Sequence, residues 1–197
     1  MSETGNYLID IEAAAIAKIL SAKRPLPPPP DPLPKDYVAP VPRTVVNKAD
    51  VFRGEKDEVF FAIVREVAPA VWLRLDRALN TAKEFEQPNA LGQIITTGTT
   101  QNRVTLVWEF FICAQSLRAT KELTHGGPGV IGIYDLLLAL TGAPKGMTNP
   151  PTPSPMQLTG WKPVSYAEPF VFVGWELLGQ TTTAAVYELQ LRTRVQL

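Results

Sequence analysis

The chain has 197 residues, of which 45% are hydrophobic and 19% charged, and its formal net charge at pH 7 is zero. This composition supports one domain with a sizeable core, and a neutral chain has no general electrostatic attraction for nucleic acid or anionic lipid. The single cysteine, Cys113, excludes an internal disulfide. Residues 1–24 lack the pattern of a secretory signal, and no uncharged apolar run reaches the roughly 18 residues that span a bilayer. We therefore expect an intracellular protein without a membrane segment.

The first predicted element is an amphipathic helix at residues 6–22, because apolar residues recur there at steps of three and four. Asn6 is placed to cap the N-terminus of this helix, and Pro25 ends it. Residues 1–24 are therefore treated as an N-terminal helical segment.

A proline-rich segment follows, and we predict an extended arm over residues 25–58. Residues 25–42 contain nine of the nineteen prolines. Because proline fixes φ and moves the preceding residue to extended geometry, a polyproline-II-like conformation is expected. Three roles stay open: an arm packed on its own or a neighbouring subunit, a PxxP ligand for SH3-type domains, or a plain spacer. The residues assigned to the arm are Pro25, Pro27, Pro28, Pro29, Pro30, Pro32 and Pro34.

Residues 59–197 are predicted to form one core domain, with short strands at first and a helix between later strands. The expected elements, in chain order, are strands near 59–66 and 70–76, a loop over 86–101, a strand at 102–117, a helix at 129–142 closed by Gly142, and strands near 157–165, 170–178 and 184–196. Long strands with two helices at scattered places indicate an α+β fold, in which an antiparallel sheet is packed with two main helices on one face and carries a proline-rich extended arm and loop.

The last strand has the clearest alternation, with one apolar face and one polar face. The polar face is interpreted either as a sheet face that meets water or as the lining of a subunit interface or channel. The residues assigned to it are Glu188, Gln190, Arg192 and Arg194.

Three motifs of catalysis or binding are weighed and set aside. Gly127, Gly129 and Gly132 fit G-x-G-x-x-G before a helix, but the second strand with its acidic end, which a dinucleotide site requires, does not follow. Cys113 lies between apolar neighbours in a strand, as a buried structural cysteine does, so a thiol pair with His125, the only histidine, is not expected. The acidic run "RGEKDE" indicates a solvated turn. No catalytic, cofactor or metal residue is therefore predicted.

Three stretches in a fixed order resemble the small tail terminator, or tail-completion, proteins of Mu-like contractile-tailed bacteriophages. They are "YLIDIEAAAIAKIL", then "TLVWEFFICAQSL" with "GIYDLLLALTG", and last "PFVFVGWELLGQTTTAAVYELQLRTRVQL". Together they span most of the chain except the proline-rich arm and residues 43–58.

The resemblance implies a non-enzymatic virion protein, made in the host cytoplasm and located at the tail and neck. Such a subunit forms a homo-oligomer, commonly a hexameric ring, that caps the tail tube and contacts tube, sheath and neck or connector proteins. DNA would pass through its lumen without specific binding, and no cofactor is implied. A different head-to-tail connector, a baseplate component or an SH3-ligand adaptor are the alternatives that the sequence leaves open.

Overall fold

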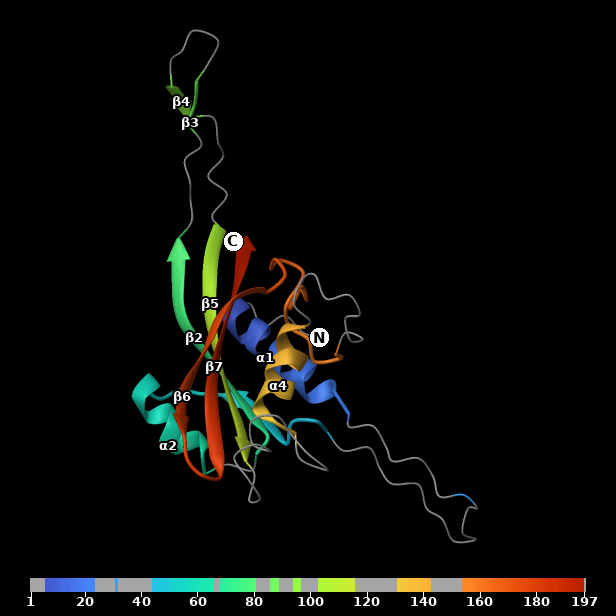
Figure 1. Cartoon of the computed structure of the whole chain (residues 1–197). Coiled ribbons are helices and arrows are strands. Elements are labelled where there is room, and N and C mark those ends of the chain that lie inside the picture. The colour runs from blue at the N-terminus through green and yellow to red at the C-terminus, as the bar shows by residue number, and fades with distance from the viewer. Residues whose placement is uncertain are drawn as a thin grey trace.

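A computed structural model provides the structure of the chain (Figure 1). It describes residues 6–23, 31, 44–65, 68–80, 86–88, 94–96, 103–115, 131–142 and 154–196. Within these residues the fold is α+β, as predicted, with one five-stranded sheet, one two-stranded sheet and three α-helices. The helices are α1 (Tyr7–Ser21), α2 (Val59–Ile63) and α4 (Ile133–Thr141), and a 3-10 turn, η1 (Lys56–Glu58), precedes α2.

The main sheet is mixed, which corrects the prediction of an antiparallel sheet. Its strand order is β1 (Lys48–Val51), β2 (Ala70–Asn80), β5 (Arg103–Gln115), β7 (Ala184–Gln196) and β6 (Val171–Gln180). All neighbours are antiparallel except β1 and β2, which are parallel. Parallel neighbours need a crossover connection, and the segment that holds η1 and α2 supplies it.

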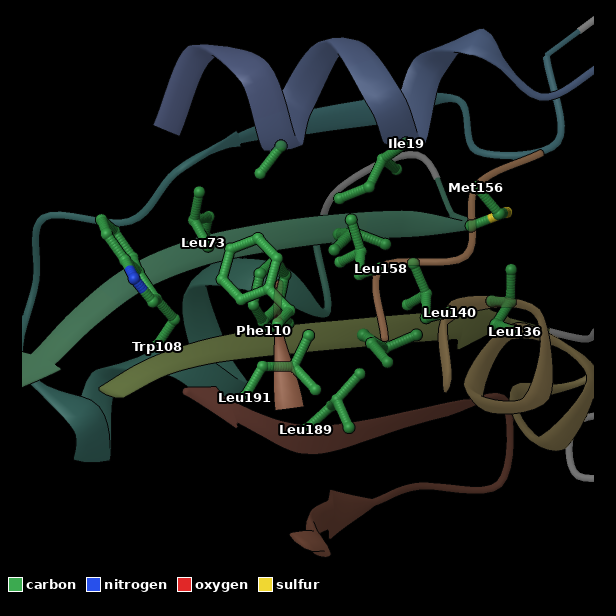
Figure 2. Packing of buried hydrophobic residues seen from close by; sticks show 14 of the residues in the cluster. Ile19, Leu73, Trp108, Phe110, Leu136, Leu140, Met156, Leu158, Leu189 and Leu191 are labelled. Carbon is green, nitrogen blue, oxygen red and sulfur yellow. The ribbon is translucent and has the colours of Figure 1, made fainter. Parts of the chain in front are cut away.

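One face of the sheet packs against α1 and α4. Ile11, Ala15 and Ile19 recur on one side of α1 and are fully buried, as the predicted amphipathic pattern requires. The capping role of Asn6 is confirmed, because its Oδ1 accepts a hydrogen bond from the Leu8 amide at 3.1 Å. Figure 2 shows Ile19 from α1 and Leu73, Phe110 and Leu189 from the sheet in the same apolar layer, together with Leu136 and Leu140 of α4.

The opposite face packs against α2, where the sequence predicted a strand. Val59 and Ile63 are four residues apart, so both point to the sheet, and they contact a small cluster with Phe111, Cys113 and Val186. The β-branched and aromatic composition of this segment indicates a strand locally, but the crossover from β1 to β2 requires a compact element here. The prediction of a strand near 59–66 was therefore wrong.

Two other local predictions need correction. The expected loop at 86–101 contains β3 (Glu86–Pro88) and β4 (Ile94–Thr96), which pair as a two-stranded antiparallel sheet apart from the main sheet (Figure 1). The expected strand near 157–165 is a series of turns with one isolated bridge, Thr159 to Phe170. Leu158 in this range and Met156 just before it are buried in the core that the main sheet and α1 share, which explains the apolar pattern without a strand.

Three elements agree closely with prediction. The last strand was expected at 184–196 and is β7 over those residues, while the expected strand at 102–117 is β5. The expected helix at 129–142 is α4, which is shorter at its start. Gly142 follows it with a φ of 80°, a left-handed conformation that favours glycine at a helix end.

The predicted arm divides in two. Residues 44–58 include β1 and η1 and so belong to the sheet region, whereas all seven assigned prolines lie outside the described residues. An antiparallel bridge joins Lys23 to Thr44, and the Val45 amide donates to the Ala22 carbonyl at 2.9 Å, so the two ends of the intervening segment are held together. Among the helices of the described chain, none is long and apolar enough to cross a membrane.

Candidate functional site

The polar side chains of β7 share one face of the sheet, as the alternation predicted, but their environments differ. Glu188 is fully buried and Gln190 half-buried, whereas Arg192 and Arg194 are exposed. The face is therefore an internal polar contact at one end and a surface at the other. The two arginines are the most exposed of these four side chains, so they are the best placed to contact another molecule.

Glu188 belongs to a buried charge cluster that sequence reasoning did not find. Lys56 Nζ of η1 lies 2.6 Å from Glu188 Oε2, 3.3 Å from Glu176 Oε1 of β6 and 3.8 Å from Glu109 Oε1 of β5. One lysine therefore contacts three strands and holds η1 against the sheet. The sequence assigned the acidic residues of this turn to solvent, and Glu55, Asp57 and Glu58 are indeed exposed, but Lys56 between them turns inward.

Two further side chains complete the charge cluster. Arg74 Nε donates to Glu109 Oε2 at 2.8 Å, and Gln190 Nε2 donates to Glu188 Oε1 at 2.6 Å. Glu109 and Glu188 are both fully buried on adjacent strands, and a buried carboxylate is costly unless it is paired. The cluster meets this requirement with two cations and one amide.

The two buried carboxyl groups differ in acidity. Burial raises the pKa of Glu188, but contacts with Lys56 and Gln190 outweigh burial and hold the pKa below its ordinary value. Burial, and then the neighbouring charge of Glu188, raises the pKa of Glu109, and Arg74 offsets this only in part. Glu109 is therefore the first of the two to take up a proton as the pH falls.

Strand β6 presents a second surface, which we call the β6 edge surface. The strand is at the edge of the main sheet, so in the described chain it pairs on one side only, with β7. Five of its apolar side chains are 43–51% exposed, which is unusual for a strand of a folded domain. These residues are Val171, Phe172, Val173, Trp175 and Leu177.

The exposed aromatic side chain of Tyr134 in α4 extends the β6 edge surface, and the buried ring of Tyr187 in β7 contacts it from the core. The ring of Trp175 lies 6.1 Å from that of Tyr134 and 5.6 Å from that of Tyr187, measured between centroids. Burial, and then a hydrogen bond with Tyr134, raises the pKa of Tyr187 to about 12, so the Tyr187 hydroxyl group stays protonated at neutral pH. The exposed side chain of Leu138 lies one turn after Tyr134 on α4. Large aromatic and aliphatic groups of this kind are typical of the centre of a protein interface.

The residues of the rejected motifs divide between described and undescribed parts. Cys113 is fully buried, and burial raises the pKa of its thiol to about 12, which confirms the expected structural cysteine. Gly132 is the N-cap residue of α4, and its amide donates to Asp135 Oδ2 at 3.3 Å. His125 and the first two glycines of the motif lie outside the described residues. The described ranges contain no group of three or more metal-ligating side chains.

The sequence contained one signal for the charge cluster and one for the β6 edge surface. Glu109 interrupts an otherwise apolar stretch of β5, and a charge in such a strand indicates a buried ion pair. The segment "PFVFVGWELL" is apolar at successive positions, which is typical of a strand covered on both faces. Neither signal identifies the partner, because Lys56 is 53 positions before Glu109, and no strand of the described chain pairs with the outer edge of β6.

Comparison with known proteins leaves the chain unassigned: no family model matches it, and no curated protein matches it.

Proposed function

We propose that this chain is a structural virion protein, a tail terminator whose copies form a ring that caps a phage tail tube and joins the tail to the neck. The protein would act by contact between surfaces, without catalysis or cofactor. Its neighbours would be further copies of itself, the tube and sheath proteins below, and the neck or connector proteins above.

The β6 edge surface is the observation that carries the proposal. An edge strand offers unpaired backbone N–H and C=O groups, and folded proteins commonly protect such edges with charges, prolines or covering elements. β6 instead exposes five apolar side chains on a ten-residue strand. Contact with another chain would remove these apolar side chains from water and pair the backbone N–H and C=O groups of the edge strand. This favours an assembly subunit.

A ring requires that two different surfaces of each copy meet, because a surface that meets only itself closes a dimer. The β6 edge surface is one such surface. The resemblance supports a ring in particular, since its three stretches form α1, β5 with α4, and β6 with β7, in the expected order.

The predicted site residues take separate roles in this proposal. Glu188 and Gln190 keep η1 fixed to the sheet from inside, and Arg192 and Arg194 face the lumen or the next subunit. The proline-rich arm, which includes Pro25 and lies in sequence between the bridged residues Lys23 and Thr44, would contact a neighbouring copy. A segment with φ already fixed loses less conformational entropy when it docks.

Removal of the gene from a phage genome that encodes this chain tests the proposal directly. We expect heads without tails, together with tail tubes of abnormal and variable length, because tube growth is not stopped. Tubes of normal length that fail to join heads would indicate a connector instead. Infectious particles with normal tails would contradict the proposal altogether.

A further inference from the structure

Four arginines gather on one face of the main sheet, at the end away from the charge cluster. Arg77 of β2 and Arg192 of β7 both pair with Val107 of β5, so the two arginines lie on the same face on either side of the central strand. Arg194 and Arg103 follow at the next two positions on that face, since their register partners are Thr105 and Gln196. We call Arg77, Arg103, Arg192 and Arg194 the arginine face; they are four of the ten arginines in the chain.

A cavity of about 150 Å³ lies at one border of the arginine face. Arg103, Arg194 and Lys162 all line it, together with the turn that includes Ser165 and Glu168. This turn is held to β7 because the Glu168 amide donates to the Arg194 carbonyl at 2.7 Å. Three cations and one carboxylate, that of Glu168, therefore surround a hollow of a size that accepts a small oxyanion.

Two ion pairs of this region, those of Arg194 and Arg77, are long and exposed. Arg194 Nη1 lies 3.9 Å from Glu168 Oε2, and Arg77 Nε lies 3.5 Å from Asp76 Oδ2. The side chains of both arginines are at least half exposed. Exposed pairs of this kind contribute at most about 1 kcal/mol, so a stronger acceptor can replace the carboxylates. In the charge cluster, by contrast, Lys56 and Glu188 form a short ion pair at 2.6 Å.

We propose that the arginine face binds the phosphate backbone of nucleic acid without reading its base sequence. Guanidinium groups present planar donors that match phosphate oxygens in pairs, and all four residues of the face are arginine and not lysine. Along β7, Arg192 and Arg194 are two residues apart, and so are separated by roughly 6.6–6.8 Å. The zero net charge is a sum over the whole chain and does not describe the local charge of one face. On the arginine face the cations are concentrated on three neighbouring strands.

An acidic surface of another protein copy is the alternative occupant, and the exposed turn with Glu55, Asp57 and Glu58 is an example within this chain. The cavity favours phosphate, because a tetrahedral oxyanion can contact three surrounding cations at once. The inference stands without the ring; in the proposed ring it would assign Arg192 and Arg194 to the lumen and not to a subunit contact.

The test measures binding of a fluorescently labelled 30-base-pair duplex of mixed sequence by anisotropy, between 50 and 200 mM salt. Four phosphate contacts predict a log–log salt slope of about −3.6, which is about a 150-fold loss of affinity over this range. Arg192→Gln removes one contact, so the slope becomes about −2.7 and the loss about 40-fold. Arg53→Gln is the matched control, because Arg53 is exposed and pairs at 3.6 Å with Glu12 of α1, outside the arginine face.

Each other result would overturn the inference. Absence of duplex binding at 50 mM salt, or binding that does not change with salt, excludes a phosphate contact surface. Equal effects of Arg192→Gln and Arg53→Gln exclude the arginine face in particular. If the Arg192→Gln variant binds the duplex as the wild type does but has a lower solution mass than the wild type, the face binds an acidic surface of a second copy.

Discussion

Lys56 lies in an exposed acidic turn, yet its amine is the cation closest to the buried carboxylate of Glu188. About 40% of its side chain is exposed, so the amine enters the charge cluster from the surface. The cluster joins η1 to three strands, including the edge strand β6 through Glu176. We therefore expect Lys56 to stabilise the arrangement of η1 and β6 more than an ordinary surface lysine.

Lys56→Met tests this role. The change leaves Glu188 buried without its cation, so we expect the free energy of unfolding to fall by about 2 kcal/mol. This loss is smaller than that for breaking a fully buried ion pair, because the amine of Lys56 is partly exposed. Denaturant unfolding measures it. Lys162→Met, an exposed lysine outside the cluster, is the control and should change stability by less than about 0.5 kcal/mol. Adding Glu188→Gln to Lys56→Met should recover part of the loss, and no recovery would contradict the pairing.

The same contact predicts a pH dependence at the alkaline end. Burial lowers the pKa of Lys56, but contacts with Glu188 and Glu176 outweigh it and raise the pKa above 10.5. A raised pKa in the folded state means that Lys56 contributes stability fully below its unfolded pKa and loses it as pH rises through the folded pKa. The stability difference between wild type and Lys56→Met should therefore be constant near pH 8 and shrink above about pH 10.5. A difference that grows at high pH would be inconsistent with this contact.

The sequence predicted single-residue environments where they follow from the neighbours in the chain. Asn6 as a helix cap, Cys113 as a buried thiol and Gly142 at a helix end depend on local pattern alone, and all three are confirmed. Glu109 and Glu188 were not foreseen as partners in one cluster, because their contact with Lys56 depends on strand pairing and on the crossover path.

Among the elements, α2 and β6 make a close contact that a single methyl group should disturb. A Cβ added at Gly179 would lie 2.6 Å from Cδ2 of Phe60, whereas a Cβ at Gly174 of the same strand would meet nothing within 4 Å. Gly179→Ala should therefore lower the free energy of unfolding by about 1–3 kcal/mol, as overpacking does.

Gly174→Ala is the matched control for this prediction. It is the same substitution in the same strand, and it should leave stability unchanged or raise it slightly because alanine has less conformational freedom when unfolded. Thermal or denaturant unfolding compares the two variants. Equal stability of both would show that α2 is not packed on β6 as described.

Periodicity was sufficient for the elements whose local pattern and final environment agree. The alternation in β7 and the three- and four-residue spacing in α1 each match the face that is buried, so their bounds were predicted within a residue or two. The pattern failed at 59–66 because the crossover between β1 and β2 outweighs the strand preference of valine and phenylalanine. It failed at 157–165 because turns can bury apolar residues without forming a strand.

The sheet order of the whole molecule could not be predicted, because β1 lies in a segment assigned to the arm and pairs in parallel with β2. The α+β class followed from the mixture of element types alone. The candidate site was predicted only in part: the polar face of β7 was identified, but the β6 edge surface, on which the proposed assembly depends, was not.

The role of the proline-rich arm can be tested at the level of the assembly. Deletion of residues 25–36 should leave a folded subunit, since the Lys23–Thr44 bridge lies outside the deleted residues, while the assembly becomes weaker. Circular dichroism checks folding, and sedimentation at several concentrations checks assembly. A glycine-serine segment of equal length is the control for stiffness and should assemble less well than wild type. Assembly of the deletion variant at wild-type strength would reduce the arm to a spacer.

The central claim is that another copy of the chain covers the β6 edge surface, and the solution mass measured by light scattering tests it most directly. The wild-type protein should have a mass several times 21.6 kDa. Val173→Lys places a charge on the exposed edge and should give a folded monomer, whereas Ile9→Lys, an equally exposed apolar position on α1, should keep the wild-type mass. A wild-type monomer at micromolar concentration, or a Val173→Lys variant with the wild-type mass, would contradict the account.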